Sequence, residues 1–421
     1  MVEQQLFASI DAKPRRAALA MLALATTIAS VGLAAGGTAG TLLAEKMVGT
    51  DAAAGLSVGL LVAGSAVTAL VISRQAGRIG WGRSLMLGYV LGAIGGMLVI
   101  IAAIAGSFGV LLVGNIMLGA ANSSVFLTRY VAAEVAGEAG RGRALGAIYF
   151  ATAIGAVASP SLLGPGGALA HAIGLPPLSG LYMIAVVSST AAALLVAAMS
   201  HPAMPYIGNG AALFGPSSSA HVALREIASG LKAIPPRIAL VVLATSNLIM
   251  VGIMAIVPVH MAAMSNSLQI TGMVVSVHVA GMFAPSPITG WLADRVGPVP
   301  VALTGILLLT TAGATGIFIG QHDAFSMGLM VIILGLGWNC GAVGGSVLLA
   351  ASVPGALRPH IEGIGEVTMG VAAAMGAPIA GVIAAHGGIP ALSMTGASVA
   401  LFVLAFVSQA MRRGLGRGSL S

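Results

Sequence analysis

The chain has 421 residues, of which 58% are hydrophobic and only 7% are charged, whereas soluble domains carry about 25% charged residues. This composition excludes a water-soluble protein, because no soluble fold could bury so much apolar surface, and it predicts an all-α integral membrane protein. The net charge of +7 comes from single basic residues in short connections. These lack the aromatic interleaving of a nucleic-acid site, so we expect no nucleic-acid partner.

Twelve apolar segments are long enough to cross the lipid bilayer, which takes about 20 residues each. They cover residues 17–43, 52–73, 84–105, 108–132, 143–168, 178–199, 237–260, 269–292, 299–320, 324–350, 360–385 and 389–411. Lys13, Arg15 and Arg16 before the first segment could belong to a signal peptide. The apolar run is longer than the about 7–15 residues of such a peptide, so an uncleaved first helix is expected.

The basic residues indicate how the segments cross the membrane. With the amino terminus in the cytoplasm, seventeen of the eighteen Lys and Arg residues fall in cytoplasmic connections and only Lys46 falls outside. Because short cytoplasmic loops are enriched in Lys and Arg, this pattern predicts a multi-pass protein of the cell (inner) membrane with both termini cytoplasmic.

The longest polar interval divides the chain into two parts. Residues 1–199 and 237–411 each hold six of the apolar segments, and residues 412–421 form a short cytoplasmic tail. The interval 200–236 is rich in Pro, Gly and Ser, which is typical of a linker. Near its end Leu224, Ile227, Leu231 and Ile234 recur at helical spacing, which predicts an amphipathic helix on the cytoplasmic surface.

The two parts share short motifs at an interval of about 217 residues. Gly290, Asp294, Arg295 and Gly297 lie between two apolar segments, and a weaker copy runs from Ser73 to Gly80, with Arg78 and Gly80 kept and Gly77 in place of the acid. Such an internal repeat indicates two related six-helix units.

These motifs resemble those of the major facilitator superfamily of secondary transporters, over essentially the whole chain. The segment from Glu134 through Arg141 and Arg143 to Gly146 adds to the resemblance. The fifth span, with Gly146, Gly155, Pro160 and Gly164, is similar to the family's antiporter motif, although Ser159 and Leu163 replace glycines. The resemblance implies two pseudo-symmetric six-helix bundles, alternating access, and helix packing by Gly146, Gly155, Pro160 and Gly164.

The resemblance also implies a conformational gate, in which Asp294 accepts from the amide end of the fifth helix near Gly142 and Arg143. A solvated loop pair is the alternative. Because Gly77 lacks the acid, we expect Glu362 in the first turn of the eleventh helix, or alternatively Glu366, to supply the charge and meet Arg78, unless Glu362 only caps its own helix. The candidate gate residues are Asp294, Arg295, Gly290, Gly297, Arg78, Gly80, Glu134, Arg141, Arg143 and Glu362.

By the same resemblance, the first, fourth, seventh and tenth spans line the substrate cavity. The candidate contacts are Asn115, Asn122, Asn247, Met250, Met254, Trp338 and Asn339. An aromatic ring with amides and thioethers favours a largely apolar or planar organic solute. Each of these residues could instead serve helix packing.

His278 and Glu366 lie well inside predicted spans, where ionisable groups are costly and often functional. His278 is near the middle of the eighth span and Glu366 is two turns into the eleventh. Both are candidates for proton coupling, and His titrates in a suitable range. The alternatives are a packed histidine and a second gate residue.

The sequence gives no sign of an enzyme. Gly55, Ser57 and Gly59 match a nucleophile elbow, but no strand precedes them. No Walker sequence or zinc-spaced His/Cys set occurs, so we expect no cofactor and no metal.

The sequence therefore predicts a monomeric secondary transporter that exports a small organic, amphiphilic or planar solute by proton antiport. Two departures from the family's exporters weigh against this: Asn115 occupies the place of a usual arginine, and the first span has hydroxyls but no acid. An uptake carrier for a nutrient or metabolite, either a proton symporter or a facilitator, is the first alternative. A non-transporting membrane sensor is the second.

Overall fold

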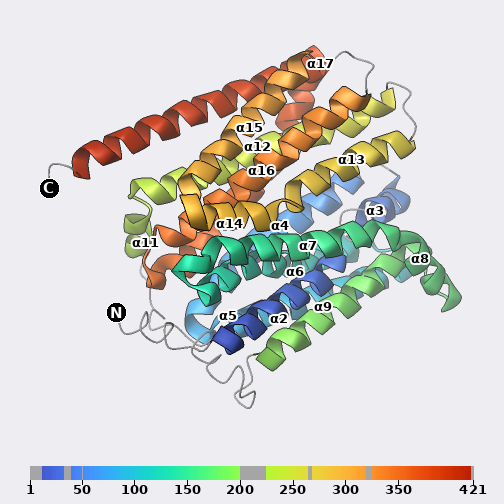
Figure 1. Ribbon diagram of the computed structural model, residues 1–421. Helices are drawn as coiled ribbons and strands as arrows, with labels where there is room; N and C mark the ends of the chain where they lie inside the picture. Colours follow the sequence, from blue (N-terminus) through green and yellow to red (C-terminus); the bar gives the residue numbers. More distant parts are fainter. Residues whose placement is uncertain are drawn as a thin grey trace. The chain divides into compact units, whose positions relative to one another are not determined.

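The computed structural model describes residues 12–32, 39–49, 51–199, 224–263, 268–318 and 324–418. These residues form helices and short connections without any strand (Figure 1). The all-α prediction is thereby confirmed, as expected where lipid offers the backbone no hydrogen-bonding partner. Most of the predicted linker, and the last residues of the tail, lie outside the described residues.

Within its described residues, the first half of the chain contains eight α-helices, where six spans are predicted. The helices are α2 (Ala12–Val31), α3 (Gly40–Val48), α4 (Asp51–Ile79), α5 (Trp81–Ala105), α6 (Phe108–Ala136), α7 (Arg141–Ser161), α8 (Leu163–Ala172) and α9 (Gly180–Met199). Short 3-10 turns η2 (Glu138–Gly140) and η3 (Pro177–Ser179) precede α7 and α9.

The second half begins with the short helix α11 (Leu224–Gly230), where an amphipathic helix is predicted. It continues with α12 (Ile234–Ala263), α13 (Leu268–Phe283), α14 (Ser286–Val296), α15 (Pro298–Phe318), α16 (Ala324–Ala351), the turn η4 (Gly355–Leu357) and α17 (Arg358–Gly418). Helix α17 covers the predicted eleventh and twelfth spans. It bends at Gly388, whose φ of 63° is not helical, between the two predicted segments.

Two spans predicted as continuous are broken in the structure. Residues 143–168 divide into α7 and α8, and residues 269–292 divide into α13 and α14. Proline explains both breaks, because it lacks an N–H and crowds the preceding turn. Pro165 cannot donate to the carbonyl of residue 161, while Pro285 and Pro287 flank the start of α14.

Nine helical stretches within the described ranges are long and apolar enough to cross a membrane. The last, Gly355–Met411, joins two predicted spans. The helices α2 and α7, at the predicted first and fifth spans, are not among the nine. The multi-pass helical fold is therefore established, whereas the count of twelve crossings stays a prediction.

The chain divides into two compact units. Unit 1 consists of Met1–Glu138, Ala151–Val222 and Gly355–Val367, and unit 2 of Ala139–Phe150, Ala223–Pro354 and Thr368–Ser421. The long helices α7 and α17 thus each contribute to both units: α7 begins in unit 2, and α17 begins in unit 1. The predicted division into bundles 1–199 and 237–411 remains a proposal.

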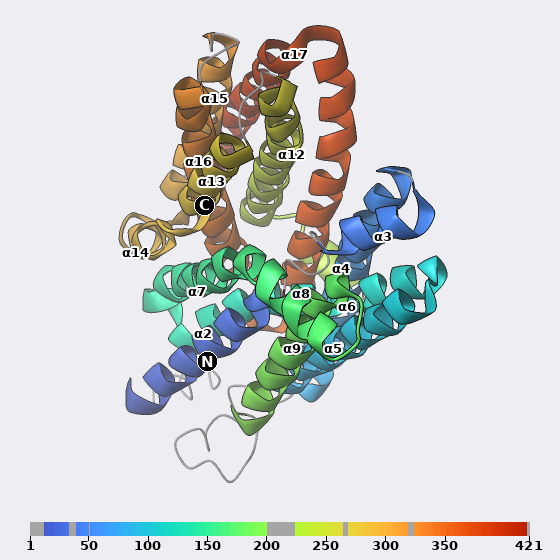
Figure 2. The same cartoon turned by 90° about the vertical axis from the view of Figure 1, so that its right-hand side faces the viewer.

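Glycines let the helices of each unit pack closely. In unit 1, α5 packs along α6 and α9 (Figure 2). A side chain at Gly92 would collide with Ala121 of α6. In unit 2, a side chain at Gly341 of α16 would collide with Ser246 of α12. Such small-residue contacts replace the hydrophobic driving force that lipid removes.

Candidate gate and solute-binding residues

The carboxylate of Asp294 lies at the amino-terminal end of α7, within unit 2. Its Oδ1 accepts the backbone N–H of Gly142 at 2.5 Å, and its Oδ2 accepts the N–H of Arg143 at 3.0 Å. The first amides of a helix have no partner within the helix, and the helix dipole favours an anion there. The structure therefore places Asp294 at the amides near Gly142 and Arg143 that the family resemblance implies.

The guanidinium of Arg143 also reaches Asp294, with Nε 3.2 Å from Oδ2. Its side chain is 60% exposed, whereas that of Asp294 is 8% exposed. Exposed ion pairs contribute only about 0–1 kcal/mol. The two backbone amides are consequently the main partners of the carboxylate.

Glycines bring α14 and the start of α7 into contact. A Cβ added to Gly290 would collide with the carbonyl oxygen of Gly142, and one added to Gly146 with the carbonyl oxygen of Ser286. Any side chain at these positions would push the helices apart and lift Asp294 off the amides. Of the predicted gate and packing residues, the structure thus brings together Gly290, Asp294, Arg143 and Gly146.

The turns that follow α4 and α14 have nearly the same backbone. Gly80 has φ 86° and ψ 158°, and Gly297 has φ 94° and ψ 157°. This region is essentially restricted to glycine. Arg295, just before the second turn, is exposed and stacks over Trp291 at 5.1 Å from its ring centroid. Arg295 therefore acts at the surface of α14, away from the amides of α7.

The remaining predicted gate residues are dispersed. Glu134 at the end of α6 accepts from Trp81 Nε1 at 3.1 Å. Arg141 is buried at the start of α7. Glu362 is also buried, whereas Arg78 is exposed at the end of α4. The proposed approach of Arg78 to Glu362 stays a prediction.

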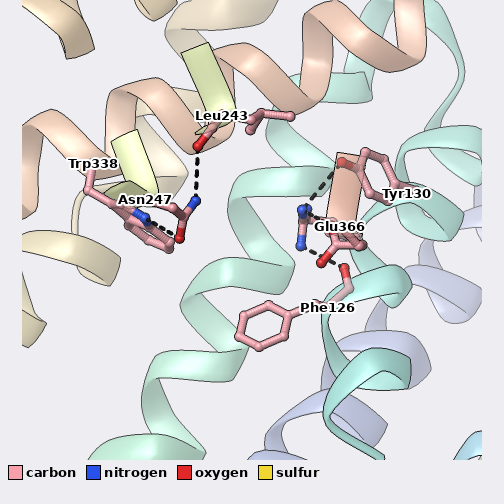
Figure 3. Close-up of polar contacts among 7 residues, drawn as sticks. Phe126, Tyr130, Leu243, Asn247, Trp338 and Glu366 are labelled. Atoms are coloured by element: carbon pink, nitrogen blue, oxygen red, sulfur yellow. Dashed lines mark hydrogen bonds and ion pairs between the residues drawn. The ribbon is translucent and has the colours of Figure 1, made fainter. Parts of the chain in front are cut away.

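An ion pair joins Arg129 of α6 to Glu366 of α17 within unit 1 (Figure 3). The Arg129 side chain is 1% exposed and that of Glu366 is 11% exposed. Arg129 also donates to the carbonyl of Phe126 at 2.9 Å and to the hydroxyl of Tyr130 at 3.3 Å. The pattern of single residues does not predict this pair. The sequence does show Arg129 and Glu366 in two different apolar spans. Because buried charges need partners of opposite charge, this placement could have indicated that the two residues pair.

Asn115 belongs to a buried polar network in unit 1. Its Nδ2 donates to Ser57 Oγ at 2.7 Å, and its Oδ1 accepts from the Tyr182 hydroxyl at 3.3 Å. The side chain is fully buried and links α6 to α4 and α9. Its amide is already occupied, so this geometry favours packing over solute contact.

Asn122 of α6 lines a small cavity in unit 1. Its Nδ2 donates to Ser65 Oγ at 3.0 Å. The other lining residues are Ala29, Gly32, Leu61, Leu118, Ala121 and Ser189. The cavity is therefore mostly apolar, with an amide and a hydroxyl for polar contact.

In unit 2, Trp338 lies in a cluster of three rings. Its ring centroid is 5.9 Å from that of Tyr149 and 5.5 Å from that of Phe283, both edge to face. Trp338 Nε1 donates to Asn247 Oδ1 at 3.3 Å, and Asn247 Nδ2 donates to the carbonyl of Leu243 (Figure 3). Two of the candidate solute contacts, Trp338 and Asn247, therefore touch each other, and Met250 and Met254 are half-buried on the same helix α12 as Asn247.

Asn339, next to Trp338, has a different environment. Its Nδ2 donates to the carbonyl of Met282 and to Ser286 Oγ, each at 2.6 Å, and its Oδ1 accepts from Thr289 at 2.6 Å. These partners flank the break between α13 and α14. Asn339 therefore stabilises the break, and its amide is not directed at a solute.

His278 connects α13 to α16 within unit 2. Its Nδ1 is 2.8 Å from the carbonyl oxygen of Val331, so Nδ1 carries a proton because a carbonyl only accepts. The side chain is 2% exposed. The two candidates for proton coupling, His278 and Glu366, thus lie in different units.

Two of the four residues in the predicted packing motif of the fifth span lie in close contact with a neighbouring helix. Besides Gly146, Gly155 lies against α2, where an added Cβ would collide with the carbonyl of Thr27. Gly164 has open space around it. The side chain of Pro160 lies outside the described residues.

Within the described ranges, no three His, Cys, Asp or Glu side chains gather as a metal site requires.

Comparison with known proteins gives clear relatives. The sequence profile of the Major Facilitator Superfamily matches residues 238–414. The uncharacterized MFS-type transporters YdeG and YddS of Bacillus subtilis are 32% and 30% identical, over 92% and 94% of this chain and 90% and 91% of their own. The riboflavin transporter RfnT of Brucella anthropi is 24% identical, over 78% of this chain and 79% of its own.

Solved structures share the fold at low identity. The human organic anion transporter MFSD10 has a TM-score of 0.71 at 16% identity, covering 94% of this chain and all of that one. A bacterial homologue of the iron transporter ferroportin, outward-facing, has a TM-score of 0.73 at 11% identity, covering 93% of this chain and 99% of its own. FucP in the outward conformation has a TM-score of 0.67 at 15% identity, covering 94% and 99%.

Proposed function

The chain is a membrane transporter of the major facilitator superfamily, and from this premise we propose that it exports a small organic, amphiphilic or planar solute in exchange for protons. Membership rests on the relatives that match over most of both chains. We further propose alternating access by two six-helix bundles, a monomer, and both termini in the cytoplasm of the cell.

The contact of Asp294 with α7 supports alternating access. The carboxylate connects the end of α14 to the first amides of α7, and Gly142, Gly146 and Gly290 let the two helices approach closely. Helix ends that meet through a few hydrogen bonds and small side chains can separate and rejoin with little repacking of a core. We infer that this contact closes the cytoplasmic end in one state and opens in the other.

The character of the candidate binding residues supports an apolar or planar solute. Trp338, Phe283 and Tyr149 form a buried cluster of aromatic rings, and Asn247 Oδ1 accepts the indole N–H. The cavity at Asn122 is also mostly apolar. Stacking on rings with one or two polar anchors is the usual basis for recognising planar molecules. One relative is named a riboflavin transporter, and the flavin ring is planar.

The single observation that carries proton coupling is the ion pair of Arg129 with Glu366. A buried pair that opens leaves an uncompensated charge, which costs about 3–5 kcal/mol. A proton on Glu366 would remove the carboxylate charge and lower that cost. Glu366 therefore offers a place where a proton can bind when α17 leaves α6, which links proton movement to the conformational change.

Export is favoured by the fifth span, where Gly146 and Gly155 pack directly on α14 and α2, as the resemblance to antiporters implies. Uptake by symport or facilitated diffusion is the second candidate. Two observations favour it: Asn115 is held in an internal network, and the first-span hydroxyl groups of Thr26 and Ser30 donate to their own helix.

The purified protein in liposomes tests the proposal. An imposed proton gradient should drive a planar fluorescent dye against its own gradient, and a protonophore or Glu366→Gln should abolish this movement. A dye that moves down its gradient alone, or with the proton, would establish the uptake alternative. Dye binding without any flux would instead support a membrane sensor.

A further inference from the structure

The internal repeat identifies equivalent positions in the two units. Gly80 and Gly297 lie 217 residues apart and have nearly equal φ and ψ. The same interval relates Gly146, near the start of α7, to Gly363, near the start of α17. Gly146 packs on α14, and Gly363 packs on Ser73 of α4. The start of α7 thus lies against α14 in unit 2, and the start of α17 lies against the end of α4, the counterpart of α14 in the repeat, in unit 1.

The carboxylate–amide contact exists in only one of the two copies. In unit 2, Asp294 accepts from the N–H of Gly142. The interval assigns Gly77 to the place of Asp294 and Pro359 to the place of Gly142. Glycine has no carboxylate, and proline has no N–H. Unit 1 therefore lacks both the acceptor and the matching donor, although the helix packing at Gly363 is kept.

A different contact holds the same stretch of α17 in unit 1. Glu366 lies seven residues beyond Pro359, about two helical turns, and forms the ion pair with Arg129 of α6. Further interactions orient Arg129: it donates to the carbonyl of Phe126 and the hydroxyl of Tyr130 (Figure 3). Its guanidinium also stacks over the Tyr130 ring at 4.6 Å from the centroid. These contacts, all within α6, hold the Arg129 guanidinium in place without help from Glu366.

We propose that the Arg129–Glu366 ion pair replaces the missing carboxylate–amide contact and fastens the start of α17 in unit 1, as Asp294 fastens the start of α7 in unit 2. This inference rests on the alternating access of the proposed function. Arg129 and Glu366 are then positioning residues for the conformational step. The contact in unit 2 depends on backbone amides of α7 and the carboxylate of Asp294. The contact in unit 1 depends on the oppositely charged side chains of Arg129 and Glu366.

A single-cysteine reporter measures the closure in unit 1. Ser73 is fully buried, and a Cβ added to Gly363 would lie 2.5 Å from its hydroxyl, so the start of α17 covers it. Ser73→Cys in a Cys340→Ala background is therefore shielded from a membrane-impermeant maleimide while the contact is closed. The labelling rate needs neither a solute nor a proton gradient.

We expect Glu366→Gln to raise the labelling rate at least about tenfold, because a charge-assisted bond is lost. Arg129→Gln should raise it similarly, and the double variant no further, since the two residues act as one pair. A labelling rate unchanged by Glu366→Gln would overturn the proposal. So would additive effects of the two single variants.

The decisive variants rebuild the missing contact. Gly77→Asp with Pro359→Ala restores both the acid and the N–H, and should lower the labelling rate of Glu366→Gln about tenfold. Gly77→Ala with Pro359→Ala is the matched control without the acid, and should leave the rate high. Equal rates in the restored and control variants would overturn the proposal.

Two safeguards keep the test decisive. If Glu366→Gln does not fold, the restored and control pairs are compared with native Glu366, where the restored contact should slow labelling. If the liposome assay shows no export while the labelling follows these expectations, only the direction or the solute of the proposed function fails. The proposal that the Arg129–Glu366 pair replaces the carboxylate–amide contact in unit 1 would still hold.

Discussion

Asp294→Asn tests the closure in unit 2 with the smallest change of shape. An asparagine keeps one acceptor oxygen for the N–H of Gly142 but loses the charge, and its NH2 group faces the N–H of Arg143, which is also a donor. Hydrogen bonds to a charged group contribute roughly 1.5–3 kcal/mol, and neutral ones roughly 0.5–1.5 kcal/mol. One bond is weakened and one is lost, so the closed state should lose roughly 2–3 kcal/mol.

That loss corresponds to a factor of roughly 30–150 in the ratio of closed to open molecules. The reporter is Ala293→Cys in a Cys340→Ala background, because Ala293 is 2% exposed and lies directly beneath Gly142. Maleimide labelling should accelerate by about this factor wherever the closed state dominates. The effect should be much larger than that of Arg143→Ala, since the Arg143 side chain is 60% exposed and its ion pair contributes about 0–1 kcal/mol.

Arg295→Gln is the matched control. It removes the neighbouring charge, which stacks on Trp291 rather than contacting the amides, and should change the labelling rate by less than about threefold. If Asp294→Asn labels at the parent rate, or if Arg295→Gln accelerates labelling equally, then the amide contact does not hold the closed state. The role assigned to Asp294 would be refuted.

Three further predictions follow from the same geometry. Gly146→Ala should raise the labelling rate of the Ala293→Cys reporter, because the new Cβ collides with α14. Gly164→Ala should leave that labelling rate unchanged, because Gly164 has open space around it. Trp338→Phe should weaken binding of a planar dye about tenfold through loss of the indole and its bond to Asn247, measured by dye fluorescence in detergent. His278→Asn should keep the pH profile of liposome transport, because an amide N–H can replace Nδ1 at the carbonyl of Val331; a displaced profile would restore His278 as the proton carrier.

The sequence predicts those parts of the structure that depend on local pattern. The helix positions follow from runs of apolar residues, and the bend at Gly388 falls between two predicted spans. The contact of Asp294 with α7 is implied by the family resemblance of its motif, and it agrees with the general affinity of carboxylates for helix amino termini. The repeat places Gly80 and Gly297 at matching positions, and the structure gives them nearly equal φ and ψ.

Contacts that depend on the rotation and register of helices are not predictable in this way. Arg129 and Glu366 are 237 residues apart in sequence, and neither residue's neighbours indicate the other. Trp338 and Asn339 are adjacent, yet one contacts Asn247 and the other contacts the break between α13 and α14. Adjacent helical residues point about 100° apart, so a single span supplies both a candidate solute contact and a structural residue.

The difference between the two proton candidates follows from what each would lose on moving. His278 is tied to a backbone carbonyl between two helices of the same unit, and no step proposed here breaks that bond. Glu366 is tied to a side chain on α6, and release of α17 must break that pair. A proton can couple to movement only where its binding energy differs between the two states. Of the two residues, only Glu366 meets this condition under the proposed release of α17, which separates Glu366 from Arg129 while leaving the bond of His278 to Val331 intact.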